Sequence, residues 1–240
     1  MPRAPRGFVF DLFHTLTGME SEWSDVPSTC QLLGLDYREW DQALVAHSRW
    51  RLVGAERDPF TVMRRLVDVL DPSIPDARVR EAVDCRIRRF HHALRRIPEE
   101  NLRTLRRLRE AGLRLALLSN ADALEIASWP GSSLCGLFDV EMFSCDAGCA
   151  KPEPEIFSAC FEALGLPGSD CVFVGDGGSD ELVGARQAGM RTVFFSGVIQ
   201  SLFPERVEAR ERSADHHIRR IPEILALFAL DRPVAATPGA

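Results

Sequence analysis

Lysine is almost absent from this chain of 240 residues, because 28 of its 29 basic residues are arginine and only Lys151 is lysine. The two side chains are not equivalent: lysine carries a compact ammonium on a flexible stem, whereas arginine carries a planar fork of donors. Two interpretations of Lys151 are therefore open. It is either the remnant of a bias toward arginine or the mark of a site that needs a compact positive charge.

Three further features are missing, and each argues against a class of protein. No apolar run approaches the roughly 18 residues of a membrane span, and the first residues lack the long apolar stretch of a signal peptide. There is no surplus of positive charge either, since the net charge is −6 and the pI is near 5.6. Both nucleic acids and anionic membranes need concentrated basic surface. We therefore expect a soluble, cytoplasmic protein that binds neither.

The seven cysteines are spread along the chain and form no C-x-x-C pair. Cys145 and Cys149 lie near each other, but no second pair of cysteine or histidine stands at the spacing of a zinc site. We therefore expect buried free thiols rather than disulfides or metal ligands.

What the sequence does contain is an alternation of strand and helix patterns, in a globular composition with 45% hydrophobic and 27% charged residues. Short apolar runs typical of buried strands lie at 7–10, 115–118, 138–143, 171–174 and 192–195, with a last one near Ile218. Helical patterns lie between or after them, at 102–111, 154–164, 181–188 and 222–230. This alternation predicts an α/β fold, a doubly wound parallel sheet covered by helices on both faces.

Residues 18–96 break the alternation, because they show apolar residues only at helical spacing, interrupted by prolines. We expect a core formed by residues 1–17 and 97–232, a helical insertion at 18–96 and a flexible polar tail at 233–240. Aromatic residues of the insertion are expected to fill its own core; they are Trp23, Trp40, Trp50 and Phe60. Its basic residues near position 50 are candidate anion contacts, although a solvated helix face is the simpler expectation; they are His47, Arg49 and Arg51.

Polar side chains stand where predicted strands end. Asp11, Ser119 and Asp176 each follow an apolar run, and the carboxyl ends of parallel strands meet at one rim of a sheet, where ligands bind. Asp11 could instead cap a turn, and Ser119 could cap a helix. Two carboxylates on one rim repel each other, however, unless a cation stands between them. The pattern therefore favours a site.

These residues resemble the motifs of the haloacid dehalogenase superfamily of hydrolases, in the order that the family has them. The matching motifs are Asp11-x-x-x-Thr15, Ser119, Lys151-Pro152 and Gly175-Asp176-x-x-x-Asp180. The helical insertion matches the cap of the family's helical-cap (type C1) subgroup. The resemblance implies a Rossmann-like core and a small-molecule anionic substrate bound by a monomer or homodimer.

The resemblance also implies a role for each motif. Asp11 would be the nucleophile that forms an aspartyl intermediate. Lys151 would neutralise Asp11 and the substrate anion together. Hydrogen bonds to the transferring group or the substrate would come from Thr15, Ser119 and Asn120. A magnesium ion, which prefers oxygen ligands, would be held by Asp11, the main-chain carbonyl of Phe13, Asp176, and Asp180 or Glu181.

Two positions depart from the phosphatases of this family. Phe13 stands where they have a second aspartate that acts as general acid and base, and His14 stands where glycine is common. General acid–base help contributes roughly 10²–10⁴ in rate, and an aromatic ring cannot supply it. The family's haloacid dehalogenases, which expel halide without a proton, have an aromatic residue at this position. The acidic fourth motif, in contrast, is of the metal-binding kind.

Three functions follow from this conflict. The first is a magnesium-dependent phosphatase, a phosphoric monoester hydrolase acting on a small phosphorylated metabolite. In it, His14 or a cap residue replaces the missing acid, or the substrates have good leaving groups. The second is a 2-haloacid dehalogenase with the same nucleophile, and the third is a binding protein without activity. The metal motif favours the first function. The place of Lys151 within these motifs favours the view that the lone lysine marks a site that needs a compact positive charge.

Overall fold

A parallel sheet of six strands forms the centre of the molecule in the computed structural model, which describes residues 4–18 and 26–230. The strand order is β3-β2-β1-β4-β5-β6, and every neighbouring pair is parallel. This confirms the predicted α/β sheet. The strands are β1 (Gly7–Phe10), β2 (Arg114–Ser119), β3 (Val140–Phe143), β4 (Cys171–Gly175), β5 (Arg191–Phe195) and β6 (His216–Ile218).

The strand expected at 138–143 begins only at Val140. Asp139 explains the difference, because its side-chain Oδ2 accepts the backbone N–H of Leu115 at 2.8 Å. The aspartate side chain thus takes a hydrogen bond at the start of β2, and regular pairing of β3 with β2 starts one residue later, at Ala116 and Val140.

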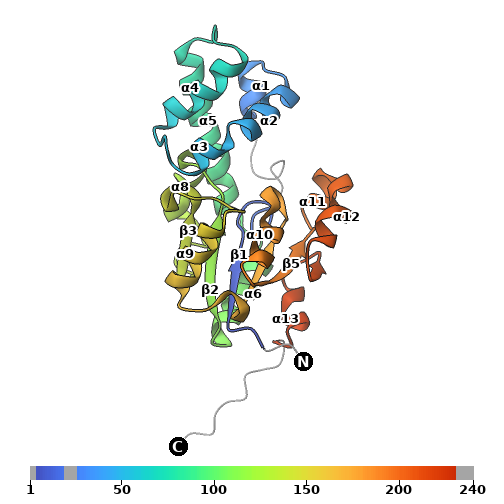
Figure 1. Ribbon diagram of the computed structural model, residues 1–240. Coiled ribbons are helices and arrows are strands. Elements are labelled where there is room, and N and C mark those ends of the chain that lie inside the picture. Colours follow the sequence, from blue (N-terminus) through green and yellow to red (C-terminus); the bar gives the residue numbers. More distant parts are fainter. Residues whose placement is uncertain (1–3, 19–25, 231–240) are drawn as a thin grey trace, which may run out of the picture.

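Helices cover both faces of the sheet (Figure 1). One face packs against α6 (Glu99–Glu110) and α13 (Glu223–Leu227), and the other against α9 (Pro154–Leu164) and α10 (Glu181–Gln187). Two short helices lie near the rim, α7 (Ala123–Ile126) and α8 (Ser144–Ala147). Each long helix buries an apolar stripe, as the spacing of its apolar residues predicts.

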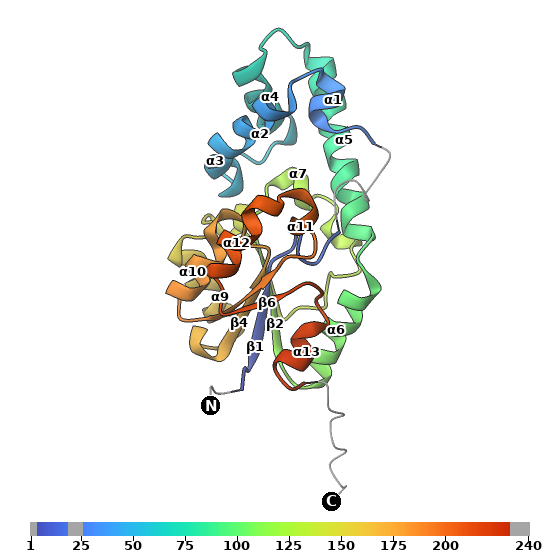
Figure 2. The same cartoon turned by 90° about the vertical axis from the view of Figure 1, so that its right-hand side faces the viewer.

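Five helices stand above the carboxyl ends of the strands, and we call them the cap helices (Figure 2). They are α1 (Thr29–Leu33), α2 (Tyr37–Ala46), α3 (Ser48–Leu52), α4 (Pro59–Leu70) and α5 (Asp76–Arg95). Trp40 belongs to their shared core, and Trp50 and Phe60 pack against it, as expected; Trp23 lies outside the described residues. The helix α5 continues down beside the sheet, where Leu94 joins the sheet's apolar cluster. The cap helices are therefore anchored to the core by packing as well as by the chain.

The sequence pattern predicts no helix between β5 and β6, yet α11 (Ile199–Leu202) and α12 (Pro204–Arg212) lie there. The helix α12 has no fully buried residue. An exposed helix lacks the apolar periodicity on which such predictions rest, which explains the omission.

All seven cysteines are free, and five of them are buried; Cys135 is exposed and Cys149 is half-buried. Among the described residues, no helix is both long and apolar enough to span a membrane. The tail expected at 233–240 lies outside the described residues.

Candidate active site

Asp11 lies directly after β1, in the middle of the sheet, and its backbone N–H donates to the carbonyl of Val174 at 2.9 Å. The buried side chain of Thr15 holds the Asp11 carboxylate, because its Oγ1 donates a hydrogen bond to Oδ2 of Asp11 at 2.9 Å. The side chain of Asp11 is only 10% exposed. Thr15 therefore orients the carboxylate that the sequence analysis selected as the nucleophile.

The ammonium of Lys151 lies between two carboxylates, 2.6 Å from Oδ1 of Asp11 and 2.5 Å from Oε2 of Glu181. The Lys151 side chain is 1% exposed. Burial alone would lower the pKa of this lysine, but the two carboxylates outweigh it and raise the pKa above its usual value. The single lysine of the chain is therefore a buried, charged group of the site.

Asn120 positions Lys151 through the main chain. Its Nδ2 donates to the carbonyl of Lys151 at 2.8 Å, and its Oδ1 accepts the Lys151 backbone N–H at 2.8 Å. The neighbouring Ser119 is 1% exposed, and its Oγ has no hydrogen-bond partner within the described part of the chain. The role of Ser119 toward a substrate stays a prediction, whereas Asn120 visibly supports the loop that carries the lysine.

Three buried carboxylates meet at the rim: those of Asp11, Asp176 and Glu181 each offer an oxygen within 4.8 Å of the others. Burial, and then the nearby Asp11 charge, raise the pKa of Asp176 and hold the pKa of Glu181 well above its usual value. Of the two residues that the resemblance leaves open as a metal ligand, Asp180 is exposed and lies outside this cluster, whereas Glu181 belongs to it. The chemistry of the cluster, oxygen donors only, fits a hard divalent cation.

Local geometry explains why Glu181 rather than Asp180 reaches the cluster. Glu181 begins α10, and its Oε1 accepts the backbone N–H of Gly177 at 2.9 Å. A β-carbon at Gly175 would overlap the Glu181 carboxylate, so the glycine of the fourth motif leaves the space that this side chain fills. Asp180, one residue earlier, has a left-handed backbone conformation.

Phe13 and His14 line the cavity in front of Asp11. The Phe13 ring packs edge-on against Phe90 of α5, with ring centroids 5.0 Å apart. It is thus a contact between core and cap rather than a polar group. His14 has a backbone φ of 60°, in the left-handed region that favours glycine, the residue that the resemblance leads one to expect there.

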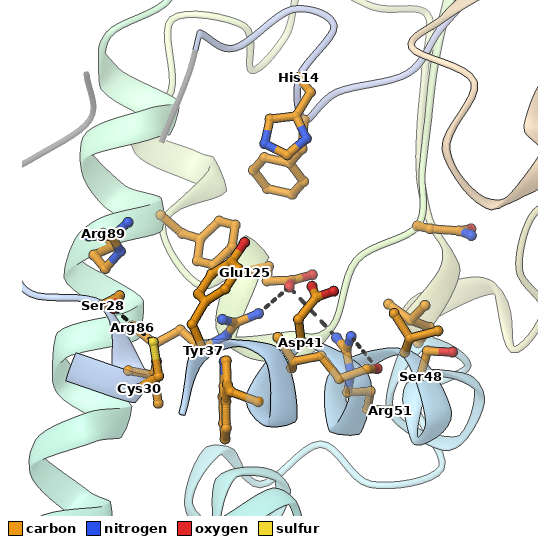
Figure 3. Close-up of a pocket in the computed structure, with 18 of the residues that line it drawn as sticks. His14, Ser28, Cys30, Tyr37, Asp41, Ser48, Arg51, Arg86, Arg89 and Glu125 are labelled. Atoms are coloured by element: carbon orange, nitrogen blue, oxygen red, sulfur yellow. Dashed lines mark hydrogen bonds and ion pairs between the residues drawn. The ribbon is translucent and has the colours of Figure 1, made fainter. Parts of the chain in front are cut away.

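The cavity in front of Asp11 has a volume of about 430 Å³ and is closed partly by the cap helix α2. Tyr37, Asp41 and Val45 lie one turn apart on the face of α2 that lines it. A second cavity of about 400 Å³ continues between the cap helices and the core. Figure 3 shows Tyr37 and Asp41 pointing from α2 into this space, with His14 on the opposite wall.

The expectation of a solvated Arg51 was wrong. Its guanidinium is 8% exposed and lies 2.7 Å from Asp122, a residue just before α7, and 3.7 Å from Glu125. Arg86 of α5 binds Glu125 at 2.6 Å (Figure 3). Arg51 is therefore a buried link between cap and core. The expectation failed because the sequence does not reveal which partner covers a helix face. Arg49 fits the expectation better, being 68% exposed.

Sequence reasoning missed two residues that line the site, Asp41 of α2 and Arg210 of α12. Nη1 of Arg210, on α12, lies 2.7 Å from the main-chain oxygen of Asp176 and 3.2 Å from its Oδ2. No sequence signal could have selected it, because it is one of 28 arginines and stands on a helix without an apolar stripe.

A family model for haloacid dehalogenase-like hydrolases matches residues 5–189, a segment that holds Asp11, Lys151, Asp176 and Glu181. The chain belongs to the haloacid dehalogenase-like hydrolases. The resemblance drawn from the motifs is thereby confirmed.

Named relatives of this chain match about half of it. It is 33% identical to a phosphoserine phosphatase of Thermus thermophilus, over 51% of this chain and 47% of the relative. It is 34% identical to haloacid dehalogenase-like hydrolase domain-containing protein 3 of Homo sapiens, over 57% of this chain and 52% of the relative. The chain thus spans about half the length of these relatives.

Solved structures named for both chemistries share the fold of this chain. An L-2-haloacid dehalogenase superposes with a TM-score of 0.65 at 21% identity, covering 95% of this chain and 100% of that chain. A HAD phosphatase from Thermococcus onnurineus gives a TM-score of 0.63 at 21% identity, with the same coverage. The likeness concerns the fold, which serves both reactions.

Proposed function

We propose that the chain is a magnesium-dependent phosphatase that hydrolyses a small phosphorylated metabolite through an aspartyl-phosphate intermediate on Asp11. The observation that supports it most is the buried cluster of Asp11, Asp176 and Glu181, with the Lys151 ammonium between Asp11 and Glu181. Asp11, Asp176 and Glu181 would hold the ion. When bound, Mg²⁺ supplies positive charge beside the phosphate oxygens.

The chain's own residues would carry out the reaction in two steps. In the first, a carboxylate oxygen of Asp11 forms a bond to phosphorus, and the bond from phosphorus to the leaving oxygen breaks with its electron pair on that oxygen. In the second, water attacks the phosphorus and the Asp11 carboxylate is released with inorganic phosphate. Lys151 stabilises the charge on the transferring group, and Thr15 keeps Asp11 oriented.

The leaving oxygen needs a proton that Phe13 cannot provide, and the cavity offers two candidates. His14 and Asp41 both line it. Asp41 is exposed on the cavity face of α2 and makes no hydrogen bond or ion pair with any residue that the structure describes. We favour Asp41 as the cap residue that supplies the proton, because its carboxyl group is not engaged elsewhere.

The residue that supplies the proton can be identified from the rates of hydrolysis of phosphate esters whose leaving groups differ in pKa. Loss of the proton donor should slow the hydrolysis of esters with poor leaving groups by roughly 10²–10⁴-fold. The hydrolysis of esters with good leaving groups should be almost unchanged. We expect this pattern for Asp41→Asn and not for His14→Asn. The reverse pattern would assign the proton to His14, and a steep fall in rate with rising leaving-group pKa in the unaltered protein would show that no acid is used.

The cap helices are proposed to close the site and select substrates, with residues 18–96 as the cap domain. The phosphatase assignment draws support from the names of relatives, including the phosphoserine phosphatase. A second candidate is 2-haloacid dehalogenase chemistry with the same nucleophile, which Phe13 favours because halide leaves without a proton.

Two assays separate these functions. We expect nitrophenol release from 4-nitrophenyl phosphate in the presence of Mg²⁺, with the rate lost in EDTA and regained on adding the ion. Halide release from 2-chloropropionate in EDTA, without phosphatase activity, would overturn the proposal in favour of the dehalogenase. Inactivity in both assays would favour a binding protein.

A further inference from the structure

The carboxylate of Asp176 already has a cation of the chain beside it. Arg210 contacts both its main-chain oxygen, at 2.7 Å, and its Oδ2, at 3.2 Å. The Arg210 side chain is 16% exposed, so water screens this pair little. Lys151 pairs with Asp11 and Glu181, and Arg210 therefore completes a set of two cations facing three carboxylates.

Arg210 occupies the oxygen of Asp176 that a metal ion would find open. Oδ1 of Asp176 accepts the backbone N–H of Gly178 at 2.8 Å, whereas Oδ2 faces the guanidinium. A divalent cation on this carboxylate and the guanidinium would repel each other at short range in a site with little water. The two positive groups therefore compete for Asp176.

The surroundings give Arg210 a place to move. Its stem crosses Gly177, where a β-carbon would lie only 3.0 Å from Cδ and 3.1 Å from Cγ of the arginine. Beside the stem lies a cavity of about 370 Å³ that is also lined by Asp180 and Glu205, both exposed. The two carboxylates in this cavity can receive the guanidinium when it leaves Asp176.

We propose that Arg210 is a resident counter-ion of the acidic cluster, and that Mg²⁺ binds Asp176 in competition with it, displacing the guanidinium into the neighbouring cavity. The inference rests on the metal site of the proposed function but not on which ester is hydrolysed. It gives Asp180 a function as a receiving partner of Arg210. It also means that the chain binds Mg²⁺ more weakly than its three carboxylates alone would allow.

Calorimetric titration of the full chain with magnesium chloride alone tests the competition. Arg210→Gln removes the charge and should lower the dissociation constant for Mg²⁺ by roughly tenfold or more. Arg210→Lys keeps the charge and should stay near the unaltered protein. Arg212→Gln is the matched control, because Arg212 lies on the same helix, is 69% exposed and pairs with Glu208 rather than with the site. It should leave the constant unchanged.

Weaker or unchanged Mg²⁺ binding by Arg210→Gln would overturn the proposal, and so would the absence of Mg²⁺ binding by every variant. If Arg210→Gln does not fold, the unaltered protein labelled with ¹⁵N-arginine replaces it. The Arg210 Nε–H resonance should then shift on saturation with Mg²⁺, and an unmoved resonance would contradict displacement. Mg²⁺ binding with these effects but without phosphatase activity would refute the proposed function alone.

Discussion

A buried ammonium and a half-buried guanidinium make different demands on their surroundings, and the site of this protein contains both. Nζ of Lys151 fits between oxygens of Asp11 and Glu181 at 2.6 and 2.5 Å, with 1% of the side chain exposed. A planar fork with several donors would be too wide for this position. Arg210 instead approaches Asp176 from the side of α12, where one nitrogen contacts two oxygens.

Lys151→Arg should therefore lower kcat by about 100-fold or more, although the charge is kept, because the larger group displaces Asp11 or Glu181. Steady-state hydrolysis of 4-nitrophenyl phosphate measures the effect. The reverse exchange at an exposed position, Arg103→Lys, is the control; Arg103 is 71% exposed on α6 and should tolerate it. Near-normal turnover of Lys151→Arg would restore the view that the lone lysine is a remnant of composition.

Single residues also mark where sequence reasoning reached its limit. Asp11, Thr15, Lys151 and Asp176 could be selected in advance, because each stands at the end of an apolar run or within an ordered set of motifs. The decision between Asp180 and Glu181 could not be made, since it depends on the backbone of the turn after β4 and on the space beside Gly175.

At the scale of elements, α3 and the loop after it form one of the contacts that join the cap helices to the core. Arg51 pairs with Asp122, whose side chain is 1% exposed. A β-carbon at Gly54, just after α3, would overlap the carbonyl of Cys145, so this loop lies directly against α8. Arg57 and Asp146 add an exposed ion pair between the same two parts. The α3 end of the cap therefore contacts the core through a buried ion pair, a close backbone contact and an exposed ion pair.

Removing the buried partner should be much more costly than removing the exposed one. Arg51→Gln leaves Asp122 buried beside Glu125 without its main cation and should lower the free energy of unfolding by about 3–5 kcal/mol. Arg57→Gln, the matched control, should cost less than about 1 kcal/mol, because water screens the exposed pair. Urea unfolding measures both. Equal costs would mean that the buried pair does not hold the cap.

Helices α11 and α12 show why elements differ in predictability. The helices that cover the sheet carry apolar residues at regular spacing and were expected from the sequence. The helix α12 buries no residue completely, yet it carries Arg210 to Asp176. Its importance lies in one polar contact, which leaves no periodic signal.

At the scale of the whole molecule, the parallel sheet brings segments from distant parts of the chain to one rim. Asp11 follows β1, Ser119 ends β2, and Asp176 follows β4, and these three strands are neighbours in the sheet. Strand and helix alternation was sufficient to predict this arrangement. The seating of the cap could not be predicted, because it depends on pairs such as Arg51 and Asp122, which are 71 residues apart.

Buried thiols give the folded chain a predictable response to alkaline pH. Burial raises the pKa of Cys160 to about 12 and that of Cys145 to about 11, from an ordinary value of 9.0. The folded protein therefore keeps protons that the unfolded chain releases, and the free energy of unfolding should fall as the pH rises above about 9. Denaturant unfolding from pH 8 to 11 measures it.

In Cys160→Ala, the free energy of unfolding should fall less steeply with rising pH, because one buried thiol no longer titrates on unfolding. Cys135→Ala, at an exposed position, should change this pH dependence less than Cys160→Ala does. A stability that rises between pH 9 and 11 would contradict the burial of these thiols.

The central claim is that Asp11 forms a covalent phosphoryl intermediate. The most direct measurement is mass spectrometry of the peptide containing Asp11, after the protein is mixed with Mg²⁺ and 4-nitrophenyl phosphate and quenched in acid within the first turnover. We predict the mass of one added phosphoryl group on that peptide, and neither the adduct nor turnover in Asp11→Asn. Continued turnover by Asp11→Asn, or a phosphoryl group on another residue, would contradict the account.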